Sequence, residues 1–264
     1  FDNINTSLEI IKKNITKKVK AIVVVHLMGY PTEIDKISNF CKKNKIYLIE
    51  DVAESMGAKY ASKMLGTFGD IGCFSFFANK IITTGEGGMC VTSNSKLFHK
   101  MKIIKSQGMS EKYNYWHEMI GSNYRLTNMQ AAIGVAQLKK VNKIIQLRKK
   151  AYMNYNFYLN KYGLKSLMVD FSSKKSINVH WQMLIQVDNR VRDKLIDYLL
   201  KKNIEAKVFF YPLSDMQIYK KYSLNKCINS QKISYKLVNL PLYPQMKKKQ
   251  INYIIMTIKE FLFK

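Results

Sequence analysis

A strand, a helix and a second strand near the start of the chain constrain its fold more than any other feature. Residues Val19–His26 form an apolar run of strand length, and Ile46–Val52 form a second one. Between them, Thr32 and Asp35 predict a capping box at the start of a helix that runs to about Lys43. Parallel strands buried on both faces need neighbours, so this pattern predicts a right-handed βαβ unit in a mostly parallel α/β sheet.

The carboxyl ends of these strands carry the residues that could do chemistry. Glu50 and Asp51 lie at the end of the second strand, where ligands of such sheets gather. The next buried strand, Ile71–Phe77, carries Ser75 and is followed by Lys80 and a glycine-rich turn. An apolar run followed by a single lysine is a poor surface loop, so it predicts a reaction centre around Lys80.

The remaining pattern predicts a second α/β unit after a long helix. Thr127 and Gln130 form a second predicted capping box, which opens a helix that runs, with a break, to about Lys161. We predict a large domain over 1–148, incomplete at its N-terminus, and a smaller C-terminal α/β domain over 149–264. The other predicted strands are 87–92, 179–187 and 204–210, and the other predicted helices are 95–106, 191–200 and 250–263.

The charge of the chain invites a nucleic-acid interpretation, which its composition disfavours. The formal net charge is +26 at pH 7, but only four of the 44 basic residues are arginines. Proteins that read phosphates rely on arginine forks, whereas these lysines follow the solvated faces of helices. We therefore expect a generic basic surface and no functional nucleic-acid binding. No membrane span is expected either, since the longest apolar run, Ala21–Met28, is short and contains His26.

The four cysteines indicate neither a disulfide framework nor a metal site. Cys41, Cys73, Cys90 and Cys227 lack paired spacing, and the first three lie in apolar stretches. We expect these thiols to pack as small hydrophobic groups in a protein of the reducing cytoplasm.

Lys80, Asp51 and Ser75 match the needs of one organic cofactor. Pyridoxal 5'-phosphate (PLP) requires a lysine that holds its aldehyde as a Schiff base, a carboxylate that keeps its pyridine nitrogen protonated, and donors for its phosphate. The alternative for Lys80 is a structural or solvated lysine, which is common at the end of a buried strand.

Three segments make a family resemblance specific. The chain resembles the DegT/DnrJ/StrS sugar-nucleotide aminotransferases, and among them the perosamine synthases, in the segments FSFFANK and YWHEMIG. The similarity extends in order along essentially the whole chain and implies the PLP-dependent transferase fold type I. The segments that carry it are EDVAESMGAKY (Glu50–Tyr60), GDIGCFSFFANKIITTGEGGM (Gly69–Met89) and YWHEMIGSNYRLTNMQAAIGVAQL (Tyr115–Leu138).

The resemblance implies a role for each matching residue. Lys80 matches the Schiff-base lysine, whose pKa should be lowered by burial and nearby positive charge so that it can move a proton. Asp51 matches the carboxylate at the pyridine nitrogen, and Glu54 matches the position near the ring hydroxyl. Ser75 matches a phosphate ligand, and Asn123 matches one that reaches across from the other subunit, which implies a homodimer with shared active sites.

Each residue that could contact a substrate has a structural alternative. Arg125 could clamp the carboxylate of glutamate, although a structural ion pair is an equal alternative. His26 and His117 could contact the sugar nucleotide, with a hydrogen-bonded structural histidine as the favoured alternative. Ser214 and Ser122 stand where related sequences carry histidine and tyrosine, and these differences bear on the identity of the sugar.

The resemblance therefore implies an enzyme that transfers an amino group from glutamate to a 4-keto-6-deoxy sugar nucleotide. We expect conversion of the GDP-mannose derivative to GDP-perosamine for O-antigen or another surface polysaccharide, by a cytoplasmic enzyme. A related dehydration uses histidine in place of the lysine, so Lys80 favours transamination. Two alternatives stay open: a truncated, non-catalytic relative with an interaction or regulatory role, and an aminotransferase acting on a UDP- or dTDP-linked keto sugar.

Overall fold

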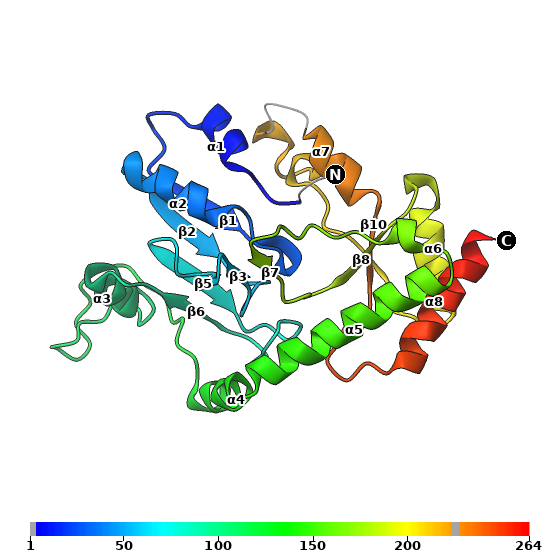
Figure 1. Ribbon diagram of the computed structural model, residues 1–264. Coiled ribbons are helices and arrows are strands. Elements are labelled where there is room, and N and C mark those ends of the chain that lie inside the picture. The colour runs from blue at the N-terminus through cyan, green and yellow to red at the C-terminus, as the bar shows by residue number, and fades with distance from the viewer. Residues whose placement is uncertain (1–3, 223–226, 264) are drawn as a thin grey trace. The chain divides into compact units, whose positions relative to one another are not determined.

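A computed structural model describes residues 4–222 and 227–263 of the chain (Figure 1). The chain divides into two compact units. The site unit comprises Asn5–Lys143 and Ser172–Val179, and the C-terminal unit comprises chiefly Ile144–Phe171 and His180–Lys264. The domain boundary between 148 and 149 stays a prediction, and the outermost residues of the predicted domains, 1–3 and 264, lie outside the described residues.

A four-stranded sheet organises the site unit, in the order β1-β2-β5-β6. Strands β1 (Ala21–Val25), β2 (Tyr47–Asp51) and β5 (Ile71–Ser75) are parallel, whereas β6 (Gly88–Val91) is antiparallel to β5. Helix α2 (Ile34–Lys43) connects β1 to β2, so the predicted strand-helix-strand unit is present with its two strands as neighbours. The parallel register brings the carboxyl ends of β1, β2 and β5 to one edge of the sheet.

One of the two predicted capping boxes is wrong. The residue that precedes α2 is Glu33, and its side chain makes no capping hydrogen bond. Thr32 is fully buried, and its hydroxyl donates to the carbonyl of Thr6 at 2.7 Å. A tertiary contact thus uses the hydroxyl that a cap would need. The box of Thr127 and Gln130 is confirmed, with both of its reciprocal hydrogen bonds present.

The rest of the site unit consists of short elements around this sheet. The predicted break in the long helix is confirmed, since α4 ends at Leu138 and α5 begins at Val141. Helix α4 buries none of its residues, and Met129 is 78% exposed. A second sheet has the order β4-β3-β7. These elements are α1 (Leu8–Asn14), η1 (Leu27–Gly29), β3 (Lys59–Tyr60), β4 (Lys63–Met64), α3 (Ser95–Ile104), α4 (Asn128–Leu138) and β7 (Ser176–Ile177).

The C-terminal unit packs helices against an antiparallel sheet of order β8-β10-β9. Its core includes Tyr155, Leu159 and Trp181, which are at most 3% exposed. The predicted strands over 179–187 and 204–210 are shorter than expected. The elements are α5 (Val141–Lys161), η2 (Lys165–Leu167), β8 (Met183–Gln186), α6 (Asn189–Lys201), β9 (Lys207–Val208), η3 (Leu213–Asp215), η4 (Lys220–Tyr222), α7 (Ile228–Ser234), β10 (Leu237–Leu240) and α8 (Lys248–Leu262).

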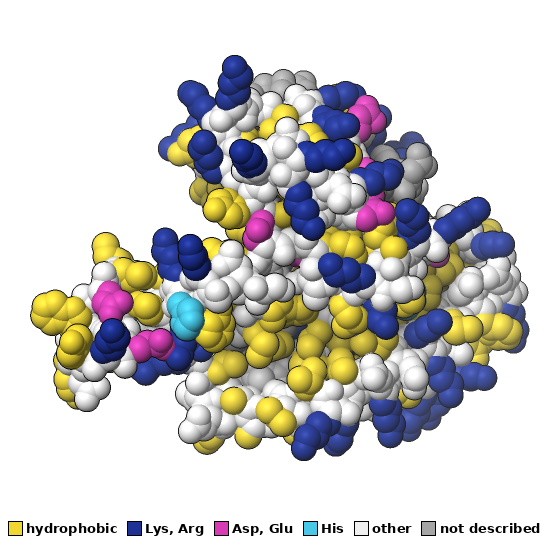
Figure 2. Space-filling model, turned by 60° about the vertical axis from the view of Figure 1, so that its left-hand side comes forward, with side chains coloured by type: hydrophobic (Ala, Val, Ile, Leu, Met, Phe, Trp, Pro, Cys, Tyr) yellow, Lys and Arg dark blue, Asp and Glu magenta, His cyan; other side chains and the backbone are white. Residues whose placement is uncertain are grey.

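The surface of the chain carries many basic side chains. Basic side chains are spread over most of the face drawn in Figure 2. Within residues 4–222 and 227–263, we find no helix long and apolar enough to cross a membrane and no cluster of side chains that could hold a metal ion. The expected burial of the cysteines holds for Cys41 but is wrong for Cys90, which is exposed.

Candidate active site

Lys80 follows β5 in a tight turn that the surrounding chain fixes. Its backbone N–H donates to the carbonyl of Phe77 at 3.0 Å, and the next two residues, Ile81 and Ile82, are at most 4% exposed. Helix α4 holds the next residue, Thr83, through two hydrogen bonds from one side chain. The side chain of Gln137 accepts from the N–H of Thr83 at 3.1 Å and donates to its carbonyl at 2.9 Å. Packing and hydrogen bonds therefore fix the backbone on both sides of the lysine.

The glycine-rich turn that returns the chain to β6 depends on backbone conformations that favour glycine. Gly85 and Gly87 have φ values of 81° and 118°, which side chains rarely adopt. A Cβ on Gly87 would lie 2.4 Å from Cδ2 of Leu126. These glycines shape the turn beyond Lys80.

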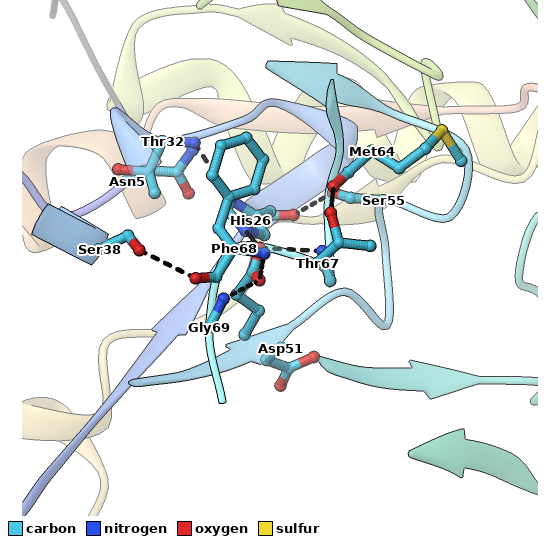
Figure 3. A network of polar contacts seen from close by, with 12 residues as sticks. Asn5, His26, Thr32, Ser38, Asp51, Ser55, Met64, Thr67, Phe68 and Gly69 are labelled. Atoms are coloured by element: carbon cyan, nitrogen blue, oxygen red, sulfur yellow. Dashed lines mark hydrogen bonds and ion pairs between the residues drawn. The ribbon is translucent and has the colours of Figure 1, made fainter. Parts of the chain in front are cut away.

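At the end of β2, neighbouring acids have different environments because successive strand residues face opposite sides of the sheet. Glu50 is 0% exposed. Its Oε1 accepts from the N–H groups of Phe68 and Gly69 at 2.6 and 2.7 Å, and its Oε2 accepts from Gly66 N–H at 2.9 Å. Figure 3 shows this network, with Asp51 beside it and outside its hydrogen bonds. Glu50 thus holds the 66–69 loop, while Asp51 lies at the sheet edge, where its Oδ1 accepts from Ala53 N–H at 3.0 Å.

His26 belongs to the Glu50 network. It is 0% exposed, its Nε2 lies 3.4 Å from Glu50 Oε2, and its Nδ1 accepts from Thr32 N–H at 3.2 Å. The ring proton therefore lies on Nε2. The hydroxyl of Ser55 donates to the His26 carbonyl at 2.6 Å (Figure 3). Both ring nitrogens are occupied within the core, which favours the structural alternative for this histidine over contact with a sugar nucleotide.

Lys80, Glu54 and Asp51 form one electrostatic group. The Lys80 ammonium lies 4.0 Å from Glu54 Oε1, and their side chains are 14% and 9% exposed. Burial lowers the pKa of Lys80, and the charges of Glu54 and Asp51 oppose this shift. The predicted lowering is thus present, but the part assigned to nearby positive charge is wrong, because the charges acting on this amine are carboxylates.

Glu54 is held by an unusual turn after β1. Its Oε2 accepts from the N–H of Met28 at 2.7 Å, and Met28 has a left-handed backbone with φ of 58°. Burial raises the pKa of Glu54, whereas the Met28 hydrogen bond and the Lys80 charge lower it. The resulting carboxyl group can be protonated more easily than a surface glutamate and lies beside the lysine.

The other predicted cofactor and substrate residues lie on two further segments. Ser75 is the last residue of β5, and its hydroxyl accepts from Phe77 N–H at 3.3 Å. Asn123 and Arg125 form a pair, since Arg125 Nε donates to Asn123 Oδ1 at 3.2 Å. In the described part of the chain, no acidic side chain forms an ion pair with Arg125.

Residues 105–124, here called the arm, present these side chains next to α3. Bridges of Ser106 with Asn123 and of Met109 with His117 fold the arm back on itself. His117 is exposed, and its Nδ1 donates to the carbonyl of Gln107 at 2.9 Å. Figure 1 shows the arm extending away from the sheet. Asn123, Arg125 and His117 therefore lie on or beside an exposed hairpin, and their roles in binding stay predictions.

The sequence pattern missed the residues that position this site. Glu50, Met28 and Gln137 were given no positioning role. Glu50 holds the 66–69 loop, whereas Met28 N–H binds Glu54 and Gln137 binds the backbone of Thr83 shortly after Lys80. Only Glu50 left a signal, because an acid inside an apolar strand, next to another acid, must face the core and find donors there. The contacts of Met28 and Gln137 depend on backbone geometry that no spacing rule encodes.

The donor set fits PLP. A partly buried amine with a lowered pKa, a carboxylate at the end of the neighbouring strand and a hydroxyl at the end of β5 are the three groups that this cofactor requires. Asp51 and Lys80 lie near enough for the aspartate charge to act on the amine. The arrangement is compatible with one pyridine ring held between them.

Comparisons with known proteins agree with this arrangement. A GDP-perosamine synthase from Escherichia coli O157:H7 is 38% identical over 257 residues, which cover 97% of this chain and 69% of that protein. A GDP-perosamine synthase from Vibrio cholerae is 36% identical over 264 residues, covering 98% and 71%. Among solved structures, Helicobacter pylori PseC, an aminotransferase involved in the biosynthesis of pseudoaminic acid, matches 97% of this chain and 70% of its own with a TM-score of 0.87 and 27% identity.

The sequence profile of one family matches residues 1–259. Its members are PLP-dependent enzymes that act on sugars, which agrees with the α/β fold and with the lysine-centred site. The chain belongs to the DegT/DnrJ/EryC1/StrS aminotransferase family.

Proposed function

We propose that this enzyme transfers an amino group from glutamate to GDP-4-keto-6-deoxymannose and so forms GDP-perosamine for surface polysaccharide biosynthesis in the cytoplasm. The observation that carries this proposal is the similarity to GDP-perosamine synthases along nearly the whole chain, combined with a lysine at the position where the related dehydration uses histidine.

Three residues of the site would each contact a different part of the cofactor. Lys80 Nζ would hold the cofactor aldehyde and, once released, carry a proton at the reacting carbon, which requires the uncharged amine that burial favours. The Asp51 carboxylate would hold the proton of the pyridine nitrogen, and Ser75 would bind the phosphate. When bound, PLP supplies an electron sink for the carbon that loses its proton.

Glu54 would lie at the ring hydroxyl, with one oxygen fixed by Met28 N–H and the other facing the Lys80 amine. A carboxyl group in this position can accept a proton from the lysine or return it, because burial has raised its pKa. Arg125 would bind a carboxylate of glutamate, and His117 would contact the sugar nucleotide from the arm. We keep His26 as a core residue.

The choice of nucleotide is tested by assay of the purified chain with PLP, glutamate and one of three 4-keto-6-deoxy sugars, linked to GDP, UDP or dTDP. We expect formation of 2-oxoglutarate and of an amino sugar with the GDP-linked substrate, detected by mass spectrometry. Turnover of the UDP- or dTDP-linked sugar alone would contradict the proposed substrate and leave the family activity intact. Loss of turnover with all three, despite bound PLP, would favour the non-catalytic alternative.

We propose further that the enzyme is a homodimer whose active sites are shared. The arm and α4 expose many large apolar side chains, among them Trp116, which is 64% exposed. The exposed set comprises Tyr113, Tyr115, Trp116, Ile120, Tyr124, Met129, Ile133, Val135 and Leu138. An apolar surface of this kind is typical of an interface between chains, and Asn123 lies within it.

Mixing two inactive variants tests the shared site. If Asn123 serves the site of the partner subunit, a mixed dimer of Lys80→Ala and Asn123→Ala chains contains one site with both defects and one with none. We expect activity to return on mixing, because roughly half of the sites in the mixed dimers are intact. Light scattering should give the protein a mass of two chains. Two variants that form dimers but stay inactive together would show that Lys80 and Asn123 act within one chain.

A further inference from the structure

Two cysteines meet across β5 and β6, a few residues before Lys80. Cys73 and Cys90 are register partners in the antiparallel pair, and their sulfur atoms lie 3.9 Å apart. Neither thiol is sealed in the core, since Cys73 is half-buried and Cys90 is exposed. The other two cysteines lie elsewhere, with Cys41 buried in α2 and Cys227 exposed just before α7.

The backbone hydrogen bonds show which kind of pair this is. The carbonyl of Cys73 accepts from Val52 N–H at 2.8 Å, so the backbone polar groups of Cys73 point towards β2 and away from β6. Along the same ladder, Phe76 N–H donates to the Gly87 carbonyl at 2.9 Å, which makes that pair a hydrogen-bonded one. Alternation then makes the cysteine pair a non-hydrogen-bonded one.

A non-hydrogen-bonded antiparallel pair brings its two residues closest together. Their Cα atoms are about 4.5 Å apart in such pairs, which lies within the roughly 4.4–6.8 Å range that a disulfide spans. The sulfur atoms already face each other, so a bond between them needs side-chain rotation and little movement of the strands.

We propose that Cys73 and Cys90 are a reversible modification site that a low-molecular-weight disulfide converts into a cross-strand disulfide. The thiolate of one cysteine attacks the small disulfide and releases one thiol, which leaves a mixed disulfide. The second cysteine loses its proton and attacks the sulfur of the first cysteine in this mixed disulfide. The protein disulfide forms, and the second small thiol is released. In total, two protein thiols are oxidised to one disulfide, and the small disulfide is reduced to two thiols.

The order of attack follows from exposure. Cys90 is the more accessible sulfur and meets the oxidant first. Burial and the neighbouring Cys90 raise the pKa of Cys73 to about 12, so Cys73 is a poor first nucleophile and acts in the second, intramolecular step. Short cross-strand disulfides at exposed positions are labile, so reducing thiols should reopen the bond.

The pair adjoins the cofactor residues through the register of the sheet. Asp51 is the partner of Cys73 across β2 and β5, so Asp51, Cys73 and Cys90 form one row on the same face of the sheet. Ser75 is two residues further along β5 on that face. A bond between the strands would therefore stiffen the sheet beside the proposed phosphate and pyridine ligands.

The experiment equilibrates the purified 264-residue chain with mixtures of reduced and oxidised glutathione, blocks the remaining thiols with N-ethylmaleimide and maps peptides without reduction. We expect a Cys73–Cys90 linked peptide that grows to most of the chain as the share of oxidised glutathione rises, and that disappears on return to reduced glutathione. No PLP or sugar is present, so the result does not depend on the proposed function.

Cys227→Ser is the matched control, because it removes an exposed thiol that lies outside β5 and β6 and should leave the linked fraction unchanged. Cys90→Ser should abolish the linked peptide, with circular dichroism checking that this variant is folded. In the wild-type chain, glutathione adducts without any Cys73–Cys90 link would overturn the proposal. A link that forms equally well in a chain unfolded by urea would overturn it too, because the fold would then play no part.

Discussion

Replacement of Lys80 by alanine is expected to abolish both amination of the sugar and covalent retention of PLP. The amine at this position is the only described group that combines partial burial, a lowered pKa and two neighbouring carboxylates. Loss of a positioned proton carrier alone lowers rates by roughly 10²- to 10⁴-fold, and loss of the covalent anchor adds to this effect. We therefore expect at least about a 10⁴-fold decrease in kcat/KM.

Two measurements separate this result from misfolding. Borohydride reduction followed by peptide mapping should place PLP on Lys80 in the wild-type chain and leave it on no lysine in the variant. The control is Lys96→Ala, which removes an exposed lysine at the start of α3 and should change neither readout. A Lys80→Ala chain that retains covalent PLP on another lysine would refute the assignment of the site.

Replacement of Glu50 by alanine should cost about 3–5 kcal/mol of unfolding free energy. The carboxylate accepts from three backbone N–H groups and from His26 in a fully buried position. Without it, these donors stay buried and unsatisfied, and each such group costs about 1–3 kcal/mol. A domain with a total stability of about 5–15 kcal/mol would lose a large share of it. Urea unfolding followed by circular dichroism measures the change.

Acid should reproduce part of this loss in the wild-type chain. Burial alone would raise the pKa of Glu50, but the hydrogen bonds from His26 and from the N–H groups of Gly66 and Gly69 lower it overall. Because the folded-state pKa lies below the unfolded one, the contribution of Glu50 is complete above about pH 4.5 and is lost as the pH falls through the folded value.

The matched control for Glu50 is Glu9→Gln, which removes an exposed carboxylate paired with Lys13 on α1. Surface substitutions of this kind change stability by about 0.5 kcal/mol or less. A Glu50→Ala chain as stable as the Glu9→Gln chain would contradict the role given to the buried network.

The sequence predicts the parts of this molecule that follow from periodicity and leaves out those that follow from tertiary contacts. Strands β1, β2 and β5, the break after α4 and the Thr127 cap could be predicted because each depends on neighbouring residues. The Thr32 cap failed because Thr6 competes for its hydroxyl. Likewise, Cys90 lies in an apolar run but is exposed, as are Gly88 and Met89 before it, so neither face of β6 is covered there by the described part of the chain.

The site shows the same division. Spacing could place Lys80, Asp51 and Ser75 at or just beyond the ends of strands, and the structure has them there, while their roles stay predictions. It could not supply the cause of the lowered pKa of Lys80, which depends on how deeply the amine is buried and on the negative charges beside it. The assignment of His26 to the core also required coordinates, because only they show that both ring nitrogens are occupied.

The adjacency of Glu50 and Asp51 has a consequence for how this enzyme can vary. Two consecutive acids on one strand have different environments: Glu50 is a permanent part of the interior, whereas Asp51 is the proposed ligand of the pyridine nitrogen. Only the pleat of β2 places them on opposite faces of the sheet. Inserting or deleting a single residue within β2 before Glu50 would exchange their orientations. Asp51 would then face the interior, and its proposed position at the cofactor would be lost. A change in the length of this strand would therefore move both carboxylates, whereas a substitution of one of its apolar residues leaves their register unchanged.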